Sequence, residues 1–351
     1  MKIGILTFVD TINYGALFQA YALETVLNGM GHDAYVIQYK NDAIEKREKN
    51  ANMLSLRGIL SFIVIGNKFK EKEKKFKAFE LENVKRTEIC NAGNIADICG
   101  QFDKIVTGSD QVWNVSLTDN DMHYFLDFVE ESSKKISYAP SFGEGTVPSA
   151  LAGQIGNLLK GFHAISVREE SGASIVLSLS GEKATVVIDP TLLLPQGVWM
   201  KFVGSRICKE PYILVYLPHK KDICFSFAKK LKAKTGLKII YLSISPRIIT
   251  GVKTIYDASP QEWLSWIYYA EYVVTGSFHG MAFSLNFGKN FFFEPQGAGS
   301  RVDCLAKMTG TEDRNLEIAE TSATINYGFV GGLLSEVRQL SLLWLKTAIE
   351  K

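Results

Sequence analysis

Short apolar runs alternate with stretches of helical spacing along most of this chain. Residues 3–8 form an apolar run typical of a buried strand, and apolar side chains between residues 17 and 27 then recur at helical spacing until two glycines end the helix. A second apolar run follows at residues 34–39. Strand, helix and strand in this order predict a βαβ unit, whose right-handed crossover builds a parallel sheet.

The same alternation predicts two groups of strands separated by a break around Pro195 and Gly204. The first group continues at residues 104–107, 135–139, 164–167 and 185–188, and the second lies at residues 212–217, 238–242, 253–256, 272–275 and 290–293. A length of 351 residues also favours two domains. We therefore predict an α/β fold of two Rossmann-like domains, residues 1–200 and 201–351, with parallel sheets facing a cleft. A terminal helix at 332–349 is expected to pack back on the first domain.

One segment departs from this pattern, because the apolar residues 53–65 lie next to the alternating Lys and Glu of residues 68–75. A helix lying on a membrane surface has such a composition. A helix that covers its own domain and turns a charged face to water has it too, and such helices are common. Peripheral membrane contact through residues 53–75 is therefore the alternative to a solvated helix.

Composition places the chain among ordinary globular proteins, with 46% apolar residues, 22% charged residues and a net charge of +2. With so small a net charge, we expect no nucleic-acid partner. The five cysteines are scattered and never form a Cys-x-x-Cys pair, which argues against a disulfide framework or a zinc site. Neither a secretory signal pattern nor an apolar run of about 20 residues is present. We expect a cytoplasmic protein without a bound metal.

The segments that follow the predicted strands are rich in small and polar residues. They are residues 10–15, 108–110, 140–143, 168–169, 189–190 and 275–280. Ligands of open α/β sheets bind beyond the carboxyl ends of the strands, and small residues there let a ligand approach the backbone. The chemistry of the protein is therefore expected in these segments.

His279 is the leading catalytic candidate, because residues 275–280 join a predicted strand to the start of a helix. Free N–H groups and the helix dipole favour a phosphate or carboxylate at such a turn. A histidine there can add a hydrogen bond or deliver a proton. A histidine that only caps the turn is the alternative, and the flanking glycines and Ser277 favour the functional interpretation.

Ser109 and Asp110 form a second candidate group with Trp113. A tryptophan beside a carboxylate suits a sugar ring, because the indole covers the apolar face of the ring and the carboxylate binds its hydroxyls. Ser and Asp are also preferred helix caps, so a purely structural interpretation stays open. Likewise, Arg168 and Glu169 either contact a ligand or form a surface ion pair.

Several familiar sites are missing from the sequence: a Gly-x-Gly-x-x-Gly after the first strand, a Walker loop, His-Glu-x-x-His and Gly-x-Ser-x-Gly. Nicotinamide-dependent, kinase and hydrolase activities are therefore disfavoured.

Taken in order, the segments resemble those of the polysaccharide pyruvyl transferase family. They are residues 13–20 (NYGALFQA), 108–114 (GSDQVWN), 137–143 (SYAPSFG), 166–169 (SVRE), 189–191 (DPT) and 277–280 (SFHG). The resemblance spans most of the chain, and the joint order of the motifs is its most specific feature. It implies a GT-B fold with the active site between the domains.

The resemblance also implies transfer of the pyruvyl group of phosphoenolpyruvate onto two sugar hydroxyls as a ketal, with no cofactor beyond this co-substrate. Its acceptor would be a sugar or a lipid-linked oligosaccharide, met in the cytoplasm or at the inner membrane face. His279 and Asp110 then carry catalysis. Donor contacts are assigned to Ser277, Phe278, Gly280, Arg301 and Lys220, and acceptor contacts to Asn13, Gly15, Ser109, Trp113, Arg168 and Glu169.

One departure from the family pattern concerns the donor side. The family that this chain resembles has an Arg-x-His pattern at the donor site, whereas this chain has Ser277 two residues before His279. Serine cannot replace a permanently charged, bidentate guanidinium. A nucleotide-sugar glycosyltransferase, a protein attached to a redox enzyme and a non-catalytic carbohydrate-binding member are therefore the alternatives, since fold alone does not fix function.

Overall fold

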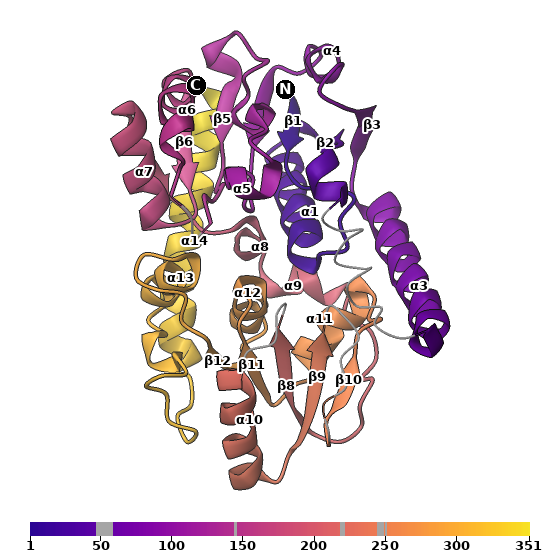
Figure 1. Ribbon diagram of the computed structural model, residues 1–351. Coiled ribbons are helices and arrows are strands. Elements are labelled where there is room, and N and C mark those ends of the chain that lie inside the picture. The colour runs from indigo at the N-terminus through magenta and orange to yellow at the C-terminus, as the bar shows by residue number, and fades with distance from the viewer. Residues whose placement is uncertain (47–58, 144–145, 218–221, 244–248, 250) are drawn as a thin grey trace.

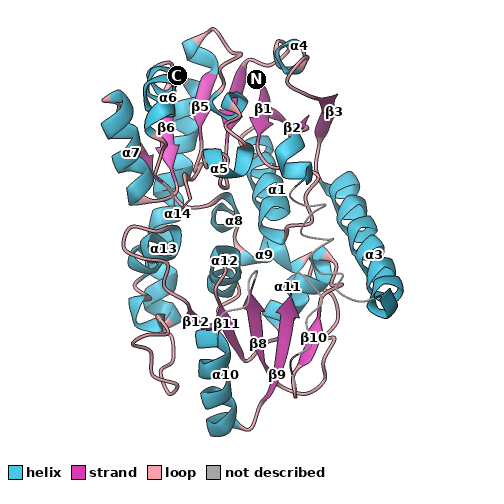
Figure 2. Ribbon diagram, viewed as in Figure 1, coloured by secondary structure: helices cyan, strands magenta, loops and turns pink. Residues whose placement is uncertain are grey.

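Two parallel sheets, one in each half of the chain, make up the computed structural model (Figure 1). It describes residues 1–46, 59–143, 146–217, 222–243, 249 and 251–351, and the side chains of residues 59–67 lie outside the description. Helices flank both sheets (Figure 2). The predicted α/β class with two parallel sheets is confirmed.

The first sheet has seven strands in the order β3-β2-β1-β4-β5-β6-β7. Its strands are β1 (Lys2–Leu6), β2 (Asp33–Tyr39), β3 (Arg86–Cys90), β4 (Lys104–Thr107), β5 (Lys135–Ser137), β6 (Ala164–Val167) and β7 (Thr185–Val186). The helices of this half are α1 (Tyr14–Gly29), α3 (Ile59–Asn83), α4 (Ile95–Cys99), α5 (Val115–Thr118), α6 (Ser149–Lys160), α7 (Glu170–Ser180), α8 (Pro190–Leu193) and α9 (Gln196–Met200). Short 3-10 turns lie at η1 (Met122–Phe125) and η2 (Ser132–Lys134).

The second sheet has five strands in the order β10-β9-β8-β11-β12. Its strands are β8 (Tyr212–Leu217), β9 (Lys238–Ser243), β10 (Lys253–Ile255), β11 (Tyr272–Thr275) and β12 (Asn290–Phe293). The helices are α10 (Asp222–Thr235), α11 (Pro260–Tyr268), α12 (Phe278–Asn286), α13 (Arg301–Thr309) and α14 (Tyr327–Glu350), with the turn η3 (Glu312–Arg314). Every strand pairing is parallel, as each βαβ crossover requires.

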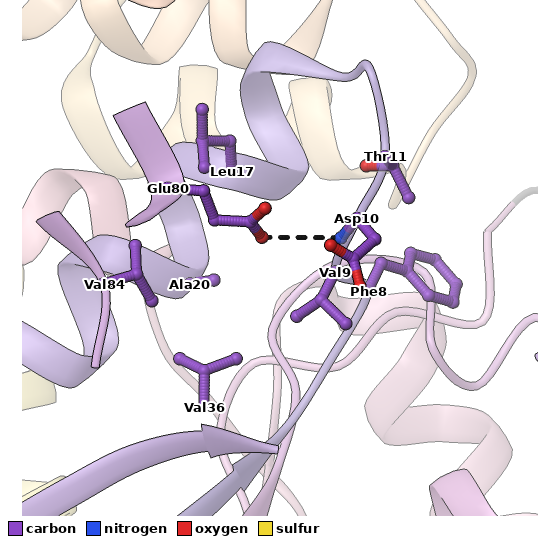
Figure 3. Close-up of a pocket in the computed structure, with 9 residues that line it drawn as sticks. All are labelled: Phe8, Val9, Asp10, Thr11, Leu17, Ala20, Val36, Glu80 and Val84. Atoms are coloured by element: carbon purple, nitrogen blue, oxygen red, sulfur yellow. Dashed lines mark hydrogen bonds between the residues drawn. The ribbon is translucent and has the colours of Figure 1, made fainter. Parts of the chain in front are cut away.

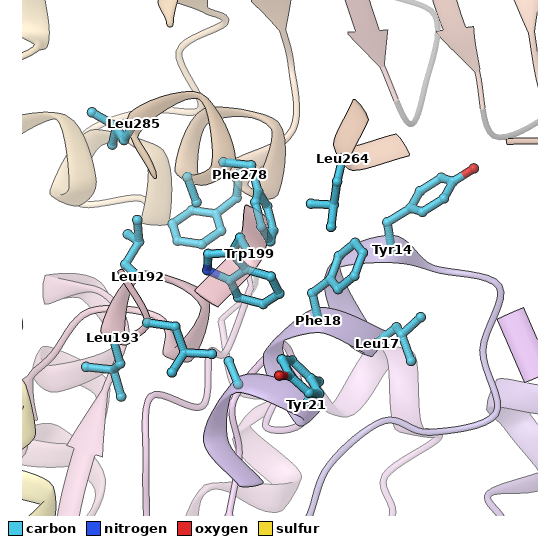
Figure 4. Close-up of a cluster of buried hydrophobic side chains, with 14 of the residues drawn as sticks. Tyr14, Leu17, Phe18, Tyr21, Leu192, Leu193, Trp199, Leu264, Phe278 and Leu285 are labelled. Carbon is cyan, nitrogen blue, oxygen red and sulfur yellow. The ribbon is translucent and has the colours of Figure 1, made fainter. Parts of the chain in front are cut away.

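An aromatic cluster joins the two halves (Figure 4). Tyr14 on α1 stacks on Trp263 of α11 with ring centroids 5.2 Å apart, and its hydroxyl donates to the Ala258 carbonyl at 2.7 Å. Phe18 contacts Trp263 and also Phe283 of α12, at 5.7 and 5.3 Å. One continuous hydrophobic core therefore contains residues from both sheets.

The terminal helix α14 also contacts both halves. Its first turn is capped by Asn326, so the helix begins five residues earlier than we predict. Further along, the backbone N–H of Ile188 donates to Ser341 Oγ, and Trp344 lies 6.1 Å from Tyr138. The division near residue 200 stays a prediction, because the buried Trp199 beside it packs on side chains of both halves.

Helix α3 contacts α11 across the other side of the junction, through charged side chains. Lys68 Nζ lies 3.2 Å from Asp257, and Lys75 Nζ lies 3.2 Å from Glu262. Residues 53–58 of the predicted membrane-contact segment lie outside the described residues. In the described part of the chain, no helix combines the length and apolarity needed to cross a membrane.

Candidate active site

The carboxyl ends of the two sheets meet at the starts of helices α1 and α12. Asn13 caps α1, its Oδ1 accepting from Gly15 N at 2.9 Å, and Ser277 caps α12, its Oγ accepting from Gly280 N at 3.3 Å. His279, the second residue of α12, reaches across to α1. An ideal Cβ on Gly15 would lie 2.1 Å from His279 Nδ1, so the imidazole lies against the bare backbone of this glycine.

The carboxylate of Asp189 contacts several groups where the two halves of the chain meet. Its Oδ2 accepts from Arg168 Nη1 at 2.7 Å, its Oδ1 accepts from Thr191 N at 2.9 Å, and His279 Nε2 lies 3.7 Å from Oδ2. Burial alone would raise the pKa of Asp189, but the neighbouring His279 and Arg168 hold it well below its ordinary value. A carboxylate that is fully enclosed therefore stays ionised and links the two halves.

Arg168 continues this chain of contacts into the first half. Its side chain is 1% exposed, and Nη2 lies 3.4 Å from Asp110 Oδ1. The guanidinium also lies over the ring of Phe278, 4.7 Å from the centroid. His279, Asp189, Arg168 and Asp110 thus form one connected series, which brings together the two predicted catalytic residues.

Asp110 lies at the outer end of the series. Its backbone has φ of 67°, an uncommon conformation for a residue with a side chain, and its Oδ1 accepts from the backbone N–H of Gln111 at 2.9 Å. The carboxylate is 10% exposed, against 0% for Asp189. Of the two aspartates, Asp110 is therefore the one that retains contact with solvent.

The protein encloses four of the side chains that we predict to contact an acceptor. Trp113 is fully buried, stacks on Phe125 at 5.2 Å and donates its indole N–H to the Tyr124 carbonyl. The other three are likewise buried and bonded to protein groups: Ser109, Arg168 and Glu169. In this structure the four side chains contact protein groups around the site, and their contact with a sugar stays a prediction.

The remaining predicted site residues are helix caps, packing residues and one charged residue near the site, apart from one outside the described residues. Asn13 and Ser277 serve as helix caps. Phe278 and Gly280 are buried, and a Cβ on Gly280 would lie 2.3 Å from Thr275 Oγ1, so both pack within the protein, and their contact with the donor stays a prediction. Arg301 is the first residue of α13, and its charge acts on the buried Glu169. Lys220 lies outside the described residues.

Burial shapes the electrostatics of Glu169. It raises the pKa of this carboxyl, against the opposing influence of Arg168 and Arg301. Glu169 Oε1 accepts from Phe142 N at 3.2 Å, and the next residue, Glu170, donates its backbone N–H to Cys304 Sγ of α13 at 3.3 Å. The start of α7 therefore packs on the start of α13, close to the connected series.

Two cavities lie apart from this series. A small one of about 10 Å³ follows strand β1 and is lined by Asp10 and Glu80, whose carboxylate accepts from Asp10 N (Figure 3). A larger one of about 250 Å³ lies between β12 and α13, where Asp303 and Glu312 line it. Neither is lined by His279 or Asp110.

Among the residues that the structure describes, no three His, Cys, Asp or Glu side chains converge on a metal position. All five cysteines are free and buried.

Asp189 is the residue that our site prediction omits. The motif at 189–191 marks a strand end, but Asp followed by Pro also reads as an ordinary helix cap, and Asp189 indeed caps α8. Its link to His279 joins residues 90 positions apart and has no local signal.

Comparison with known proteins gives a family and a fold. The sequence profile described as polysaccharide pyruvyl transferase matches residues 13–293. No curated protein matches the chain. Among solved structures, a UDP-N-acetylglucosamine 2-epimerase from Rickettsia bellii aligns with a TM-score of 0.52 and 10% identity, covering 99% of this chain and 96% of that chain.

Two further solved structures align with similar scores. A putative UDP-N-acetylglucosamine 2-epimerase from Listeria monocytogenes gives a TM-score of 0.51 at 9% identity, covering 99% of this chain and 89% of that chain. The S. aureus MnaA–UDP co-structure gives 0.51 at 11% identity, covering 100% and 98%. At such identities the likeness concerns the fold alone, which is of the GT-B type.

Proposed function

Because the chain belongs to the polysaccharide pyruvyl transferase family, we propose that it moves the pyruvyl group of phosphoenolpyruvate onto two hydroxyls of a sugar during synthesis of a cell-surface polysaccharide. Family membership makes the protein a transferase. The observation that carries the finer proposal is the position of His279, at the start of α12 and 3.7 Å from the ionised Asp189.

The electrostatics of the second half support an anionic donor. Phosphoenolpyruvate carries a phosphate and a carboxylate, and the N-terminus of a helix favours both. Ser277 and Ser300 cap helices α12 and α13, and Arg301 is the first residue of α13. We therefore assign donor binding to this side, with His279 and Arg301 as the side chains that meet it.

The chemistry requires one proton to be delivered and two to be removed. Two sugar oxygens bond to C2 of phosphoenolpyruvate, the bond from C2 to the phosphate oxygen breaks, and C3 gains a proton to become a methyl group. The second hydroxyl proton leaves with phosphate or a base. We assign proton delivery or phosphate binding to His279, and hydroxyl binding or proton removal to Asp110, which retains solvent contact.

The acceptor side is assigned to the first half, around Asn13 and Asp110. A lipid-linked oligosaccharide at the inner membrane face is the acceptor that we propose, with the enzyme in the cytoplasm. A GT-B glycosyltransferase that uses a nucleotide sugar is the rival function, since the solved structures of similar fold include a complex with UDP.

Ligand-induced stabilisation tests the proposal without a known acceptor. The thermal unfolding midpoint is measured with phosphoenolpyruvate and, separately, with a panel of nucleotide sugars. A ligand at 100 times its dissociation constant stabilises by about 2.7 kcal/mol. We expect a rise with phosphoenolpyruvate that disappears in His279→Ala and persists in His163→Ala, the matched control at an exposed histidine. A rise with a nucleotide sugar alone would make the protein a glycosyltransferase.

A further inference from the structure

Gly15 lies opposite His279 across the junction of the two halves. It is the second residue of α1, whereas His279 is the second residue of α12. Ideal Cβ placement at Gly15 falls 2.1 Å from His279 Nδ1, 2.5 Å from Cε1 and 2.6 Å from Cγ. Real Cβ contacts are essentially never shorter than 3.0 Å, so any other residue would displace the imidazole.

Helix propensity offers no reason for glycine at this position. Glycine is the weakest helix former after proline, and alanine is the best. Gly15 also lacks the positive φ that would require glycine. Its backbone N–H donates to the side-chain oxygen of the Asn13 cap, as the N–H of another residue would. The close approach of the His279 ring is therefore the physical reason for the missing side chain.

The other side of the ring is fixed as well. His279 Nε2 is buried and lies 3.7 Å from Asp189 Oδ2, a carboxylate that Arg168 and Thr191 hold in place. Phe278 meets the imidazole edge to face, with centroids 5.2 Å apart. The ring is thus held between Gly15 on one element and Asp189 on another.

We propose that Gly15 is a positioning residue, whose bare backbone sets the orientation of the His279 imidazole and thereby the activity of the site. The role given to His279 in catalysis rests on the proposed function. The close approach of Gly15 and the His279 ring is seen in the structure and does not depend on that function. A displacement of about 1 Å at a reacting group can reduce turnover by about 100-fold, so a methyl group at Gly15 is expected to act on kcat without touching a ligand.

The test compares Gly15→Ala with Gly29→Ala. Both glycines belong to α1, but a Cβ on Gly29 meets no atom within 4 Å. Gly15→Ala should lower kcat for phosphate release from phosphoenolpyruvate at least tenfold, with a smaller change in KM, whereas Gly29→Ala should stay within twofold of the wild type. Ring NMR signals of His279, assigned by their loss in His279→Ala, should shift in Gly15→Ala and not in Gly29→Ala.

A double variant separates positioning from general damage to the fold. In a His279→Ala background the ring is gone, so adding Gly15→Ala should cause no further loss of activity and should raise the unfolding midpoint, because alanine then gains its helix propensity without a clash. If Gly15→Ala leaves the His279 ring signals unmoved, or lowers the midpoint equally in both backgrounds, the inference is overturned. Because the NMR and stability measurements need no substrate, they decide the positioning role even if phosphoenolpyruvate is not the donor.

Discussion

Replacing Asp189 by asparagine tests the connected series at its centre. The substitution keeps the shape of the side chain and the two oxygen contacts with Thr191, but it removes the charge that faces Arg168 at 2.7 Å and His279 at 3.7 Å. Among the described residues, Arg168 then keeps its ion pair with Asp110, at 3.4 Å. Removing one member of a buried ion pair costs about 3–5 kcal/mol. Because part of the network survives, we expect a loss of about 3 kcal/mol, the lower end of this range.

Urea unfolding followed by tryptophan fluorescence measures this loss. Asp33→Asn is the matched control, since Asp33 pairs with Lys85 where both side chains are about half exposed, and exposed pairs contribute at most about 1 kcal/mol. The pKa of Asp189 is depressed, so its stabilisation is present above the ordinary value of 3.8 and lost as the pH falls further. The difference between wild type and Asp189→Asn is therefore measured at pH 7, well above this value. If the free energy of unfolding falls by less than about 1 kcal/mol, the ion pairs of Asp189 do not stabilise the fold in the way argued here.

Two other substitutions test the core and a buried acid. Phe18→Ala should cost about 3–5 kcal/mol, because the ring is fully buried between residues of both halves, and calorimetry should still record one transition, since the core is continuous. Burial raises the pKa of Glu24 to about 7 from its ordinary 4.5, so folding favours the protonated acid and stability should fall as the pH rises between these values, by up to about 1.4 kcal/mol per unit. Glu24→Gln should remove this slope in urea titrations at pH 5, 6, 7 and 8, and an unchanged slope would place its origin elsewhere.

Strand positions were predictable because a buried parallel strand needs a short apolar run, and such runs are visible in the sequence. Strands β4, β6, β8, β11 and β12 match the predicted residues. Strand β3 was not predicted, because at the edge of the sheet only Cys90 among its five residues is buried, and its charged residues resemble those of a loop. An edge strand forms because it pairs with its neighbour, here β2, and the residues of β3 alone do not reveal that pairing.

The sequence could locate the candidate site only through the residues that follow the predicted strands. His279 and Asp110 follow β11 and β4, and the facing of the two sheets connects them. Whether a polar or aromatic side chain at a strand end points outward depends on the helices that cover it. Trp113 stacks on Phe125, a residue from a later segment, and so its burial could not be predicted from the strand end alone.

Ser277 is best understood from its place at the start of α12. Its hydroxyl satisfies the N–H of Gly280, and loss of such a cap costs about 1 kcal/mol. An arginine at this position would give up that bond and place a positive charge at the positive end of a helix, which is unfavourable until an anion binds. Serine therefore favours the stability of the empty site, and arginine favours a site that is filled. In this chain we therefore propose that the charge that meets the donor comes from the helix start itself, together with His279 and Arg301 on the two neighbouring helices, while Lys220 lies outside the described residues.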